Sequence, residues 1–394
     1  MTASQHFDVA IVGAGPAGST LARHVALAGK SVVLIERERL PRYKTCAGGV
    51  THRAIRLLDF DVSSVIERTI TEGLITYKMD KGFVKPYHEP IAYKVMRDRF
   101  DDLLTHKAVE AGAKLFDGAH VKKVEAGGDG CIVRLSDGIS VGAQGIRPPQ
   151  EIHAKILVGA DGANGIVARE TGLQVEMRGD VALEAEIEVS PEKVQEWDKR
   201  IALDVGYITE GYAWVFPKGK HLSIGVGAMK KYAPRLRDYY ERYLESLNLG
   251  DYKVRSVRGH HIPMRLRKVP VVKGRVLLVG DAAGVADPFS GEGIYHAIKS
   301  AQLAAPTIVA NVAAERPDLS PYQRALDGHM LQDQRTAGRL LRMYALTPRV
   351  CIWYLRNHNR AWNSACKMLR GDNDWVRIRS KLGPLRAILP IFNP

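Results

Sequence analysis

The sequence is poor in cysteine and has no long hydrophobic run. No apolar stretch approaches the roughly 18 residues that a membrane-spanning helix requires, and the N-terminus has no signal-peptide pattern. The four cysteines lack the spacing of a metal site or of a secreted disulfide framework: they are Cys46, Cys131, Cys351 and Cys366. These absences predict a protein of the reducing cytosol without a bound metal.

Acidic residues are also scarce, with 43 Asp and Glu against 57 Lys and Arg and a net charge of +14. Such an excess is informative about partners rather than about fold. It favours anionic lipid, a phosphorylated substrate or an acidic redox partner. Nucleic acid is disfavoured, because the chain has neither a nucleic-acid-binding motif nor a platform of alternating aromatic and basic residues.

The N-terminal segment contains the clearest motif. An apolar strand leads into G-x-G-x-x-G at Gly13, Gly15 and Gly18, a stretch with helical spacing follows, and a second strand ends at Glu36. In such a unit the first glycine permits a tight turn, the second lets the backbone approach a pyrophosphate, and the third lets the helix pack closely. The acidic residue is placed to bind a ribose hydroxyl. This order predicts a dinucleotide-binding unit.

Two later segments also read as buried strands that end beside an aspartate. The first ends in Gly-Ala-Asp-Gly around Asp161, and the second ends in Gly-Asp at Asp281. Ligands of α/β folds bind at the carboxyl ends of strands, so we expect both carboxylates there. Asp281 is positioned to accept a hydrogen bond from the sugar-alcohol chain of a cofactor. Gly293 then begins a long helix whose N–H groups can meet a carbonyl or an anion.

Residues 176–257 have a different pattern, with strand-like runs and no strand–helix alternation. This pattern predicts an antiparallel sheet in a second lobe. Tyr212, Trp214 and Phe216 share one face of a strand, and Lys218 follows them. Such an aromatic stripe belongs either to a core or to the wall of a long apolar pocket.

A glycine-rich loop with a cysteine and the start of a helix are further candidates. Lys44, or a helix N-terminus, would lower the pKa of the Cys46 thiol. A free cysteine is as commonly a small buried hydrophobe. Arg97, at the start of a predicted amphipathic helix, is suited to a phosphate or ribose, or is a solvated charge.

The chain from Asp327 onward is helical in pattern and basic. Ten Lys and Arg are interleaved with apolar and aromatic residues: Arg339, Arg342, Arg349, Arg356, Arg360, Lys367, Arg370, Arg377, Arg379 and Lys381. This composition is typical of a surface that lies on anionic lipid headgroups. It is equally that of an amphipathic helical lobe packed on the rest of the protein. A short apolar segment, 382–392, follows.

Several of these elements together resemble known flavoproteins. The glycine loop with Glu36, the Asp161 segment, and Gly280-Asp281 with Gly291-Glu292-Gly293 resemble the FAD-binding set of the p-hydroxybenzoate-hydroxylase-like flavoproteins. Lys44-Thr45-Cys46-Ala47-Gly48-Gly49 resembles the K-x-C-G-G segment of the geranylgeranyl reductase family. The stretch 212–218, Tyr-Ala-Trp-Val-Phe-Pro-Lys, resembles the Y-x-W-x-F-P-K segment of that family. The resemblance runs to about residue 330.

The resemblance implies a non-covalent FAD that, once reduced, hydrogenates isolated double bonds of prenyl chains. It implies that the following residues contact FAD: Ala17, Glu36, Cys46, Ala47, Gly49, Arg97, Val121, Asp281, Gly293 and Ile294. Cys46, or a water that it orders, is the candidate for assisting proton delivery. Tyr212, Trp214 and Phe216 would hold the prenyl tail, and Lys218 or nearby basic residues would meet the polar head of the substrate.

Members of the resembled family act on chlorophyll precursors, archaeal-type ether lipids or free prenyl diphosphates. Ala47 stands where many members have glycine, and Thr45 where chlorophyll-type members have proline. The second difference favours a prenyl lipid or a prenyl diphosphate over a chlorophyll precursor. The chain has no second G-x-G-x-x-G for a nicotinamide cofactor. Either NADPH therefore binds transiently, or ferredoxin delivers the electrons. A basic face suits an acidic ferredoxin.

The same fold also hosts aromatic hydroxylases and halogenases, so a flavin-dependent monooxygenase or halogenase is the alternative function. A prenyl-binding escort protein without a cofactor is disfavoured by the intact glycine loop, Glu36 and Asp281. A plain dinucleotide-linked dehydrogenase is disfavoured by the Gly-Asp segment, which by resemblance is a flavin feature.

The predicted fold class is α/β. A Rossmann-type FAD-binding domain is expected from residues 1–70, 96–175 and 258–326, and an antiparallel-sheet substrate domain from 71–95 and 176–257. Residues 327–394 are expected to form a C-terminal basic helical region. We expect a cytoplasmic protein with peripheral contact to a membrane.

Overall fold

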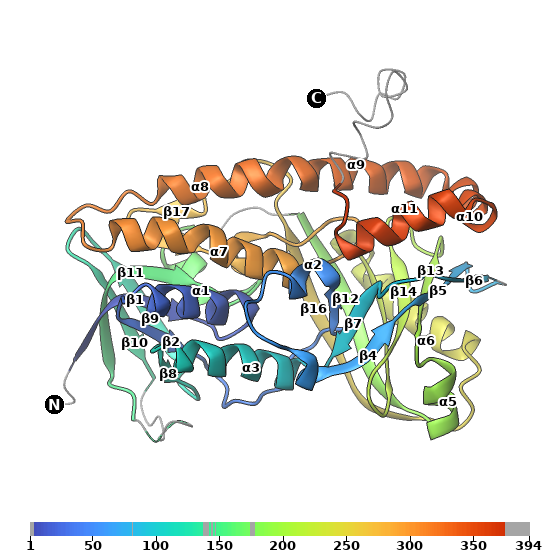
Figure 1. Cartoon of the computed structure of the whole chain (residues 1–394), viewed down its shortest axis with the longest axis horizontal. Helices are drawn as coiled ribbons and strands as arrows, with labels where there is room; N and C mark the ends of the chain where they lie inside the picture. The colour runs from blue at the N-terminus through green and yellow to red at the C-terminus, as the bar shows by residue number, and fades with distance from the viewer. Residues whose placement is uncertain are drawn as a thin grey trace, which may run out of the picture.

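Two large β-sheets and one small sheet organise the chain (Figure 1). The computed structural model describes residues 4–374 except 81, 137–141, 143, 144, 146 and 174–177. The eight-stranded sheet lies toward one end of the molecule and the seven-stranded sheet toward the other.

The eight-stranded sheet has a parallel centre made of continuous apolar runs. Its path is β17-β18-β11-β1-β2-β8, and β10 and β9 join through β11. Its strands are β1 (Gln5–Val12), β2 (Val32–Ile35), β8 (Lys114–Phe116), β9 (Val121–Ala126), β10 (Cys131–Leu135), β11 (Glu151–Gly159), β17 (Val272–Lys273) and β18 (Val276–Leu278). All four residues of β2 and all three of β18 are buried, as expected for parallel strands covered on both faces.

The register of the parallel strands brings their carboxyl ends to one edge. Val12 is opposite Ile35 on one side and Gly159 on the other, and Gly159 is opposite Leu278. The segments that follow these four strands are therefore neighbours, although they are far apart in the sequence. The helices of this region are α1 (Pro16–Leu27), α3 (Arg97–Glu110), α4 (Ile166–Glu170), α7 (Ile294–Asn311) and α8 (Ser320–Leu326). Figure 1 shows α1 between α3 and α7.

The seven-stranded sheet has the order β16-β12-β15-β14-β13-β5-β6. Its strands are β5 (Glu72–Tyr77), β6 (Phe83–Pro86), β12 (Arg178–Glu188), β13 (Arg200–Val205), β14 (Tyr212–Pro217), β15 (Leu222–Met229) and β16 (Lys253–Met264). The pairs are antiparallel, as predicted, except that β13 and β5 are parallel. These two strands come from distant segments, so no hairpin fixes their relative direction.

The two faces of this sheet have different roles because side chains alternate along each strand. On one face Ala185, Val215 and Ile224 pack in a core with α6 (Leu236–Ser246), to which α6 contributes Tyr239. The other face looks toward the eight-stranded sheet. Helix α5 (Pro191–Glu196) lies in the loop between β12 and β13.

A three-stranded sheet of β3 (Gly49–Thr51), β4 (Ile66–Ile70) and β7 (Ala92–Val95) connects the two large sheets, with α2 (His52–Ile55) after β3. One expected domain boundary is wrong. The limit at residue 257 falls inside β16, which continues in register with β12 as far as Met264. A long strand paired along its whole length has no break at that point.

The C-terminal part is helical, as predicted, through its described residues. A π-helical turn (Asp327–Leu331) leads into α9 (Gln332–Leu346), α10 (Pro348–Asn357) and α11 (Asn359–Arg370). Trp362 and Cys366 of α11 pack with Tyr87 and Ile91, so part of this region is a packed lobe. Arg377, Arg379, Lys381 and the segment 382–392 lie outside the described residues. Across the described chain, no helix combines the length and the hydropathy that crossing a bilayer demands.

Candidate active site

A cavity of about 1730 Å³ lies between the two large sheets. Its lining includes the glycine loop after β1, the loop around Cys46, the aromatic face of β14, and side chains of α9 to α11. Predicted site residues from all parts of the sequence meet here. Those that line the cavity are Gly13, Gly15, Ala17, Glu36, Cys46, Ala47, Gly49, Arg97, Val121, Asp161, Tyr212, Trp214, Phe216, Asp281, Gly293 and Ile294.

The three glycines of the first loop have different surroundings. Gly13 has φ +104°, and a Cβ there would lie 2.3 Å from the Ala160 carbonyl oxygen. A Cβ on Gly18 would lie 1.9 Å from the Gly13 carbonyl oxygen, so this glycine allows the close packing of helix on strand. Gly18 is behind the cavity wall and does not line it. Gly15 has no atom within 4 Å of the Cβ position, and it faces the cavity.

Two helices begin at the cavity without a capping side chain. Helix α1 follows Gly15 and has no acidic residue in its first turn, and α7 follows Gly293. Their first N–H groups and the positive ends of their dipoles are suited to an anion or a carbonyl oxygen. Glu292 is held by Thr51 and by Arg53, which fixes the start of α7 against β3. The open space at Gly15 and this uncapped helix fit the pyrophosphate of a dinucleotide.

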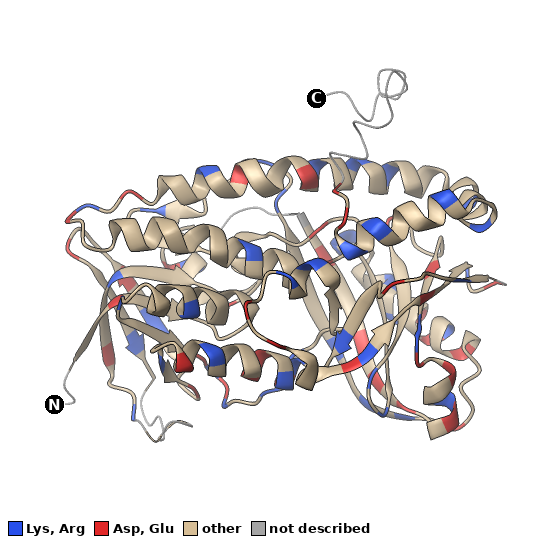
Figure 2. Ribbon diagram, in the orientation of Figure 1, with Lys and Arg blue, Asp and Glu red and all other residues tan. Residues whose placement is uncertain are grey.

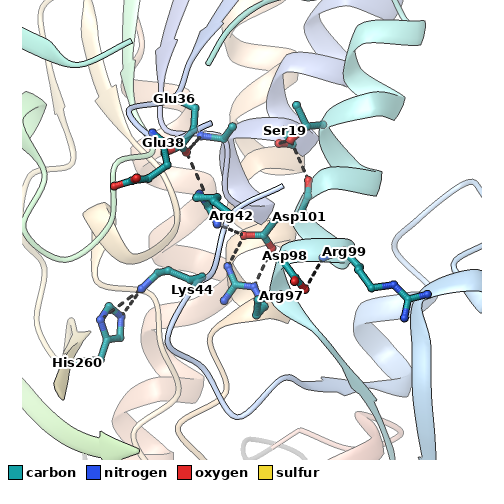
Figure 3. A network of polar contacts seen from close by, with 12 residues as sticks. Ser19, Glu36, Glu38, Arg42, Lys44, Arg97, Asp98, Arg99, Asp101 and His260 are labelled. Atoms are coloured by element: carbon teal, nitrogen blue, oxygen red, sulfur yellow. Dashed lines mark hydrogen bonds and ion pairs between the residues drawn. The ribbon is translucent and has the colours of Figure 1, made fainter. Parts of the chain in front are cut away.

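A buried ionic network joins the glycine loop before α1, the end of β2 and the first turns of α3 (Figure 3). The Glu36 carboxylate accepts the Ala14 N–H at 2.9 Å, so it braces the glycine loop from the end of β2. Arg42 lies 3.4 Å from Glu36 and donates to Asp101 at 3.0 Å. Arg97 donates to both oxygens of Asp101, at 2.7 and 2.8 Å. Figure 3 shows both guanidinium groups directed at the one carboxylate.

The reading of Arg97 as a solvated charge is therefore wrong. Its side chain is buried and paired with Asp101 across one turn of α3. Burial alone would lower the pKa of Arg97, but the ion pair outweighs it and the pKa is raised. Arg97 also lines the cavity, so a fixed positive charge is presented there.

Lys44 turns toward His260 of β16, with its Nζ 3.2 Å from Nε2. Burial and then the charge of Arg97 lower the pKa of Lys44. His260 Nε2 lies 3.9 Å from an oxygen of Asp281, which places this half-buried carboxylate at the same wall. The three side chains connect the Cys46 loop, β16 and the end of β18.

The Cys46 loop is held closely against β7. Gly48 has φ +64°, and its carbonyl accepts the Val95 N–H at 3.0 Å. Cys46 is half-buried, and its Sγ accepts the Gly48 N–H at 3.4 Å. The thiol therefore sits on the cavity wall within a constrained turn.

The prediction that Lys218 meets a substrate head group is contradicted. Lys218 is buried, does not line the cavity, and donates to the Val95 carbonyl at 3.0 Å. A Cβ on Gly48 would lie 2.6 Å from its Nζ. This lysine supports the Cys46 loop from behind, and its place after Pro217 in the sequence gave no sign of that contact.

Two charged cavity residues were missed from the sequence. Lys94 of β7 is fully buried, its Nζ is 3.1 Å from the centre of the Phe216 ring, and burial and then Lys218 hold its pKa well below the usual value. Burial raises the pKa of Glu184 of β12 to about 7, against the opposing effect of Lys218. One oxygen of Glu184 has no hydrogen-bond partner among the residues that the structure describes. Its place in the sequence gave no signal, because Asp180, Glu186 and Glu188 are acidic residues of the same strand.

The aromatic residues of β14 form a ladder on the cavity wall. Neighbouring ring centres are 5.8 Å apart for Tyr212 and Trp214, and 6.2 Å apart for Trp214 and Phe216. Tyr212 donates to the Ser290 carbonyl at 3.1 Å. Gly225 of β15 lies behind Trp214, where a Cβ would be 2.2 Å from the indole ring. The ladder is thus fixed in place and offers an apolar surface.

Asp161 lies at the edge of the cavity, but one of its oxygens is already engaged. It accepts the Val167 N–H at 3.0 Å at the start of α4, while its other oxygen has no hydrogen-bond partner within the described part of the chain. Burial raises the pKa of this carboxyl group. The residue therefore fixes the loop after β11 and leaves one acceptor near the site.

Comparison with known proteins gives a consistent set of relatives. A family described as FAD binding domain matches residues 6–323. A geranylgeranyl diphosphate reductase from Synechocystis is 32% identical, over 77% of this chain and 75% of that protein. A digeranylgeranylglycerophospholipid reductase from Methanopyrus kandleri is 32% identical, over 82% of this chain and 85% of that protein.

Two solved structures show the same fold. A geranylgeranyl bacteriochlorophyll reductase-like protein from Thermoplasma acidophilum has a TM-score of 0.79 at 22% identity, covering 96% of this chain and 100% of that one. A flavin-dependent brominase has a TM-score of 0.71 at 22% identity, covering 93% and 94%. The predicted α/β fold class is confirmed by these likenesses.

Proposed function

This chain belongs to the geranylgeranyl reductase family of FAD-binding proteins, and we propose that it saturates carbon–carbon double bonds of a geranylgeranyl or related prenyl chain on an isoprenoid or lipid. The observation that carries the proposal is the single cavity. It is continuous from the glycine loop to an apolar chamber between β14 and α9 to α11. One end suits a dinucleotide and the other suits a long hydrocarbon chain.

We propose that FAD is held at the first end by the glycine loop, Glu36, Asp281 and the start of α7 at Gly293. The support is the open space at Gly15, the uncapped α1, and the two carboxylates that follow β2 and β18 at the same edge of the sheet. When bound and reduced, FAD supplies the hydride. The remaining proposed cofactor contacts are Gly13, Ala17, Cys46, Ala47, Gly49, Arg97, Val121, Asp161 and Ile294, whereas Gly18 acts only through the packing of α1.

An isolated double bond is a poor hydride acceptor. The protein must therefore hold it in a fixed position and exclude water. Fixing reacting atoms in a near-attack arrangement supplies roughly 7–11 kcal/mol of a barrier. Tyr212, Trp214 and Phe216 provide the surface for the tail, and each buried CH₂ contributes about 0.8 kcal/mol. We assign to Cys46, on the opposite loop, the assistance of proton delivery.

Lys218 is not available to the polar head of the substrate, so another group must receive it. Lys78 and Arg360 line the cavity near its C-terminal helical wall, and Arg360 is exposed. We propose that an anionic head group, such as a diphosphate or a phospholipid head, stays at this end while the tail enters the cavity.

The electron donor and the site of action are proposed from charge and chemistry. The electron donor is NADPH, bound transiently, or ferredoxin, which the net charge of +14 would attract. The site of action is the cytoplasm beside an anionic membrane surface.

The test is anaerobic reduction of prenyl substrates by the FAD-loaded, reduced protein, followed by mass spectrometry. The expected result is a gain of two hydrogen atoms for each double bond reduced, without oxygen. A flavin-dependent monooxygenase or halogenase is the second candidate, favoured by the brominase likeness of the fold. Substrate-coupled oxygen consumption without alkene reduction would support it and overturn the first. Mass spectrometry of co-purified lipids identifies the substrate class.

A further inference from the structure

Helix α10 is unusual because it has an apolar side that is largely exposed in the described chain. None of its 10 residues is buried. Val350 is 64% exposed, Trp353 58% and Tyr354 52%, and Leu346 at the end of α9 is 82% exposed. Trp353 and Tyr354 follow Val350 by three and four positions, so the three residues lie on one side of the helix. We call these four residues the α10 patch.

The patch stands out from the rest of the described surface. Leu346, Val350 and Trp353 are the three most exposed large apolar residues in the part of the chain that the structure describes. The next, Leu27, stands alone on α1. Isolated exposed apolar residues are normal, whereas a cluster marks an interaction site.

The surroundings of the patch are strongly basic. From residue 332 to residue 370 the single acidic residue is Asp333. The basic residues in the same range are Arg335, Arg339, Arg342, Arg349, Arg356, Arg360, Lys367 and Arg370. Figure 2 shows this as blue segments along α9 to α11, with red only near the start of α9. Arg349 and Arg356 flank the patch on α10 itself and are exposed.

The patch is also at the mouth of the cavity. Leu346 and Tyr354 are exposed and line the cavity at the same time, which identifies them as its rim. Pro348, Cys351 and Leu355 line it from the same helix. Helix α10 therefore covers one end of the cavity, with one side facing the cavity and the other facing solvent.

We propose that the α10 patch docks the protein on an anionic phospholipid bilayer. Leu346, Val350 and Trp353 insert among the headgroups, and Arg349 and Arg356 contact phosphates. A helix with an apolar side and flanking basic residues binds in this way. The docking itself does not depend on the proposed reductase activity. If that activity is correct, the cavity mouth faces the membrane that holds a prenyl lipid.

A second copy of the chain is a poorer occupant. A two-fold symmetric contact places the same patch of each copy against the other. Arg349 and Arg356 of both copies would then be brought together without an acidic residue on α10 to compensate them. An anionic surface satisfies both the apolar and the basic residues.

The experiment is flotation of the full-length, FAD-loaded protein with vesicles of phosphatidylcholine, alone or mixed with phosphatidylglycerol. The wild type is expected to float with the anionic vesicles and less at high salt. Val350→Glu/Trp353→Glu is expected to reduce binding at least tenfold. Arg356→Glu is expected to reduce it at least about fivefold, since each basic residue contributes around 1 kcal/mol to binding.

Matched controls are Val257→Glu on β16 and Arg237→Glu on α6. Both residues are exposed, and α6 packs on the sheet face opposite the cavity. They are expected to bind as the wild type does. Trp353→Phe is expected to keep binding but to lose the vesicle-induced blue shift of tryptophan fluorescence. FAD content and thermal unfolding check that each variant is folded.

The proposal is overturned if the wild type does not float, if neutral vesicles bind it equally well, or if the double variant binds unchanged. Concentration-dependent dimerisation that the double variant abolishes, without vesicle binding, would instead make the patch a homodimer interface. Failure of the docking is distinguishable from failure of the reductase, because alkene reduction in detergent is independent of α10 docking.

Discussion

At the residue scale, glycine serves two different purposes in the loop after β1. A Cβ on Gly18 collides with the Gly13 carbonyl, whereas a Cβ on Gly15 meets no atom and enters the cavity. We expect Gly18→Ala to destabilise the apoprotein by about 1–3 kcal/mol. Gly15→Ala should leave the apoprotein within about 1 kcal/mol of the wild type and weaken FAD binding at least about tenfold. Thermal unfolding and flavin titration measure the two effects.

The two variants control for each other, and Gly29→Ala is a third variant for comparison. Gly29 lies after α1, away from the cavity, and its φ of +73° is unfavourable for alanine, so Gly29→Ala should lower stability without changing FAD affinity. Unchanged FAD affinity in Gly15→Ala would contradict a pyrophosphate site at this loop.

Substitution of Cys46 tests the proposed route of proton delivery. If its thiol assists proton delivery, Cys46→Ala should lower the rate of alkene reduction about 100-fold while FAD stays bound, since positioned acid–base groups contribute this much. Cys351→Ala is the matched control, because Cys351 also lines the cavity but belongs to α10. Rates come from anaerobic single-turnover measurements.

Full activity of Cys46→Ala with FAD bound would remove the thiol from the mechanism and leave it as part of the wall. A loss of FAD in the same variant would show that Cys46 acts by holding the cofactor and not by assisting proton delivery.

At the scale of elements, Trp362 is one of the side chains that attach α11 to the sheet beside it. Trp362 Nε1 donates to the Pro86 carbonyl at 2.9 Å, and its ring packs edge-on against Phe83 of β6 with centres 6.4 Å apart. Gly73 of β5 makes room for the ring, since a Cβ there would be 2.6 Å from it. We expect Trp362→Ala to cost about 3–5 kcal/mol of stability and to expose residues 359–370 to proteolysis.

Two variants separate the contributions to this attachment. Trp362→Phe keeps most of the packing and loses the hydrogen bond, at a cost of about 1 kcal/mol from that bond. Trp353→Ala, on the exposed side of α10, should change stability by no more than about 0.5 kcal/mol. Equal destabilisation by the two alanine variants would contradict the assignment of Trp362 as an anchor of α11.

Elements whose information is local were predictable from the sequence. The strand–glycine–helix unit and the shared face of Tyr212, Trp214 and Phe216 follow from short-range periodicity, and the structure has both. The parallel pairing of β13 with β5 was not predictable, because it joins segments more than 120 positions apart. The partner of Lys218 is Val95, separated by 123 positions, so its role could not be read from its neighbours either.

At the scale of the whole molecule, the cavity exists because an edge of the eight-stranded sheet lies opposite one face of the seven-stranded sheet. The eight-stranded sheet contributes the ends of its parallel strands, and the seven-stranded sheet contributes one alternating face. Both sheets were predicted in outline, but the charged residues Lys94 and Glu184 between them were not. These two residues become buried only when the sheets pack together. Because burial shifts their pKa values, the free energy of unfolding should depend on pH.

Glu184 and His296 should change the pH dependence of stability in opposite directions. Burial raises the pKa of Glu184 to about 7, with Lys218 and Lys94 opposing the shift and Glu186 adding to it. The native state therefore binds this proton more tightly than the unfolded chain, and stability is lost as pH rises from about 4.5 to about 7. Because the glutamine cannot ionise, the stability of the wild type relative to Glu184→Gln should fall by at most about 3 kcal/mol over this range.

His296 of α7 is buried beside Arg53, and burial followed by that charge lowers its pKa, against the opposing effects of Glu292 and Asp287. The unfolded chain then binds the proton more tightly, so stability is present above pH 6.5 and lost as pH falls below it. The advantage of the wild type over His296→Gln should therefore shrink on going from pH 7.5 to pH 5.5. Denaturant unfolding across this range measures both differences, and slopes of the same sign for the two pairs would contradict the burial of one of the two groups.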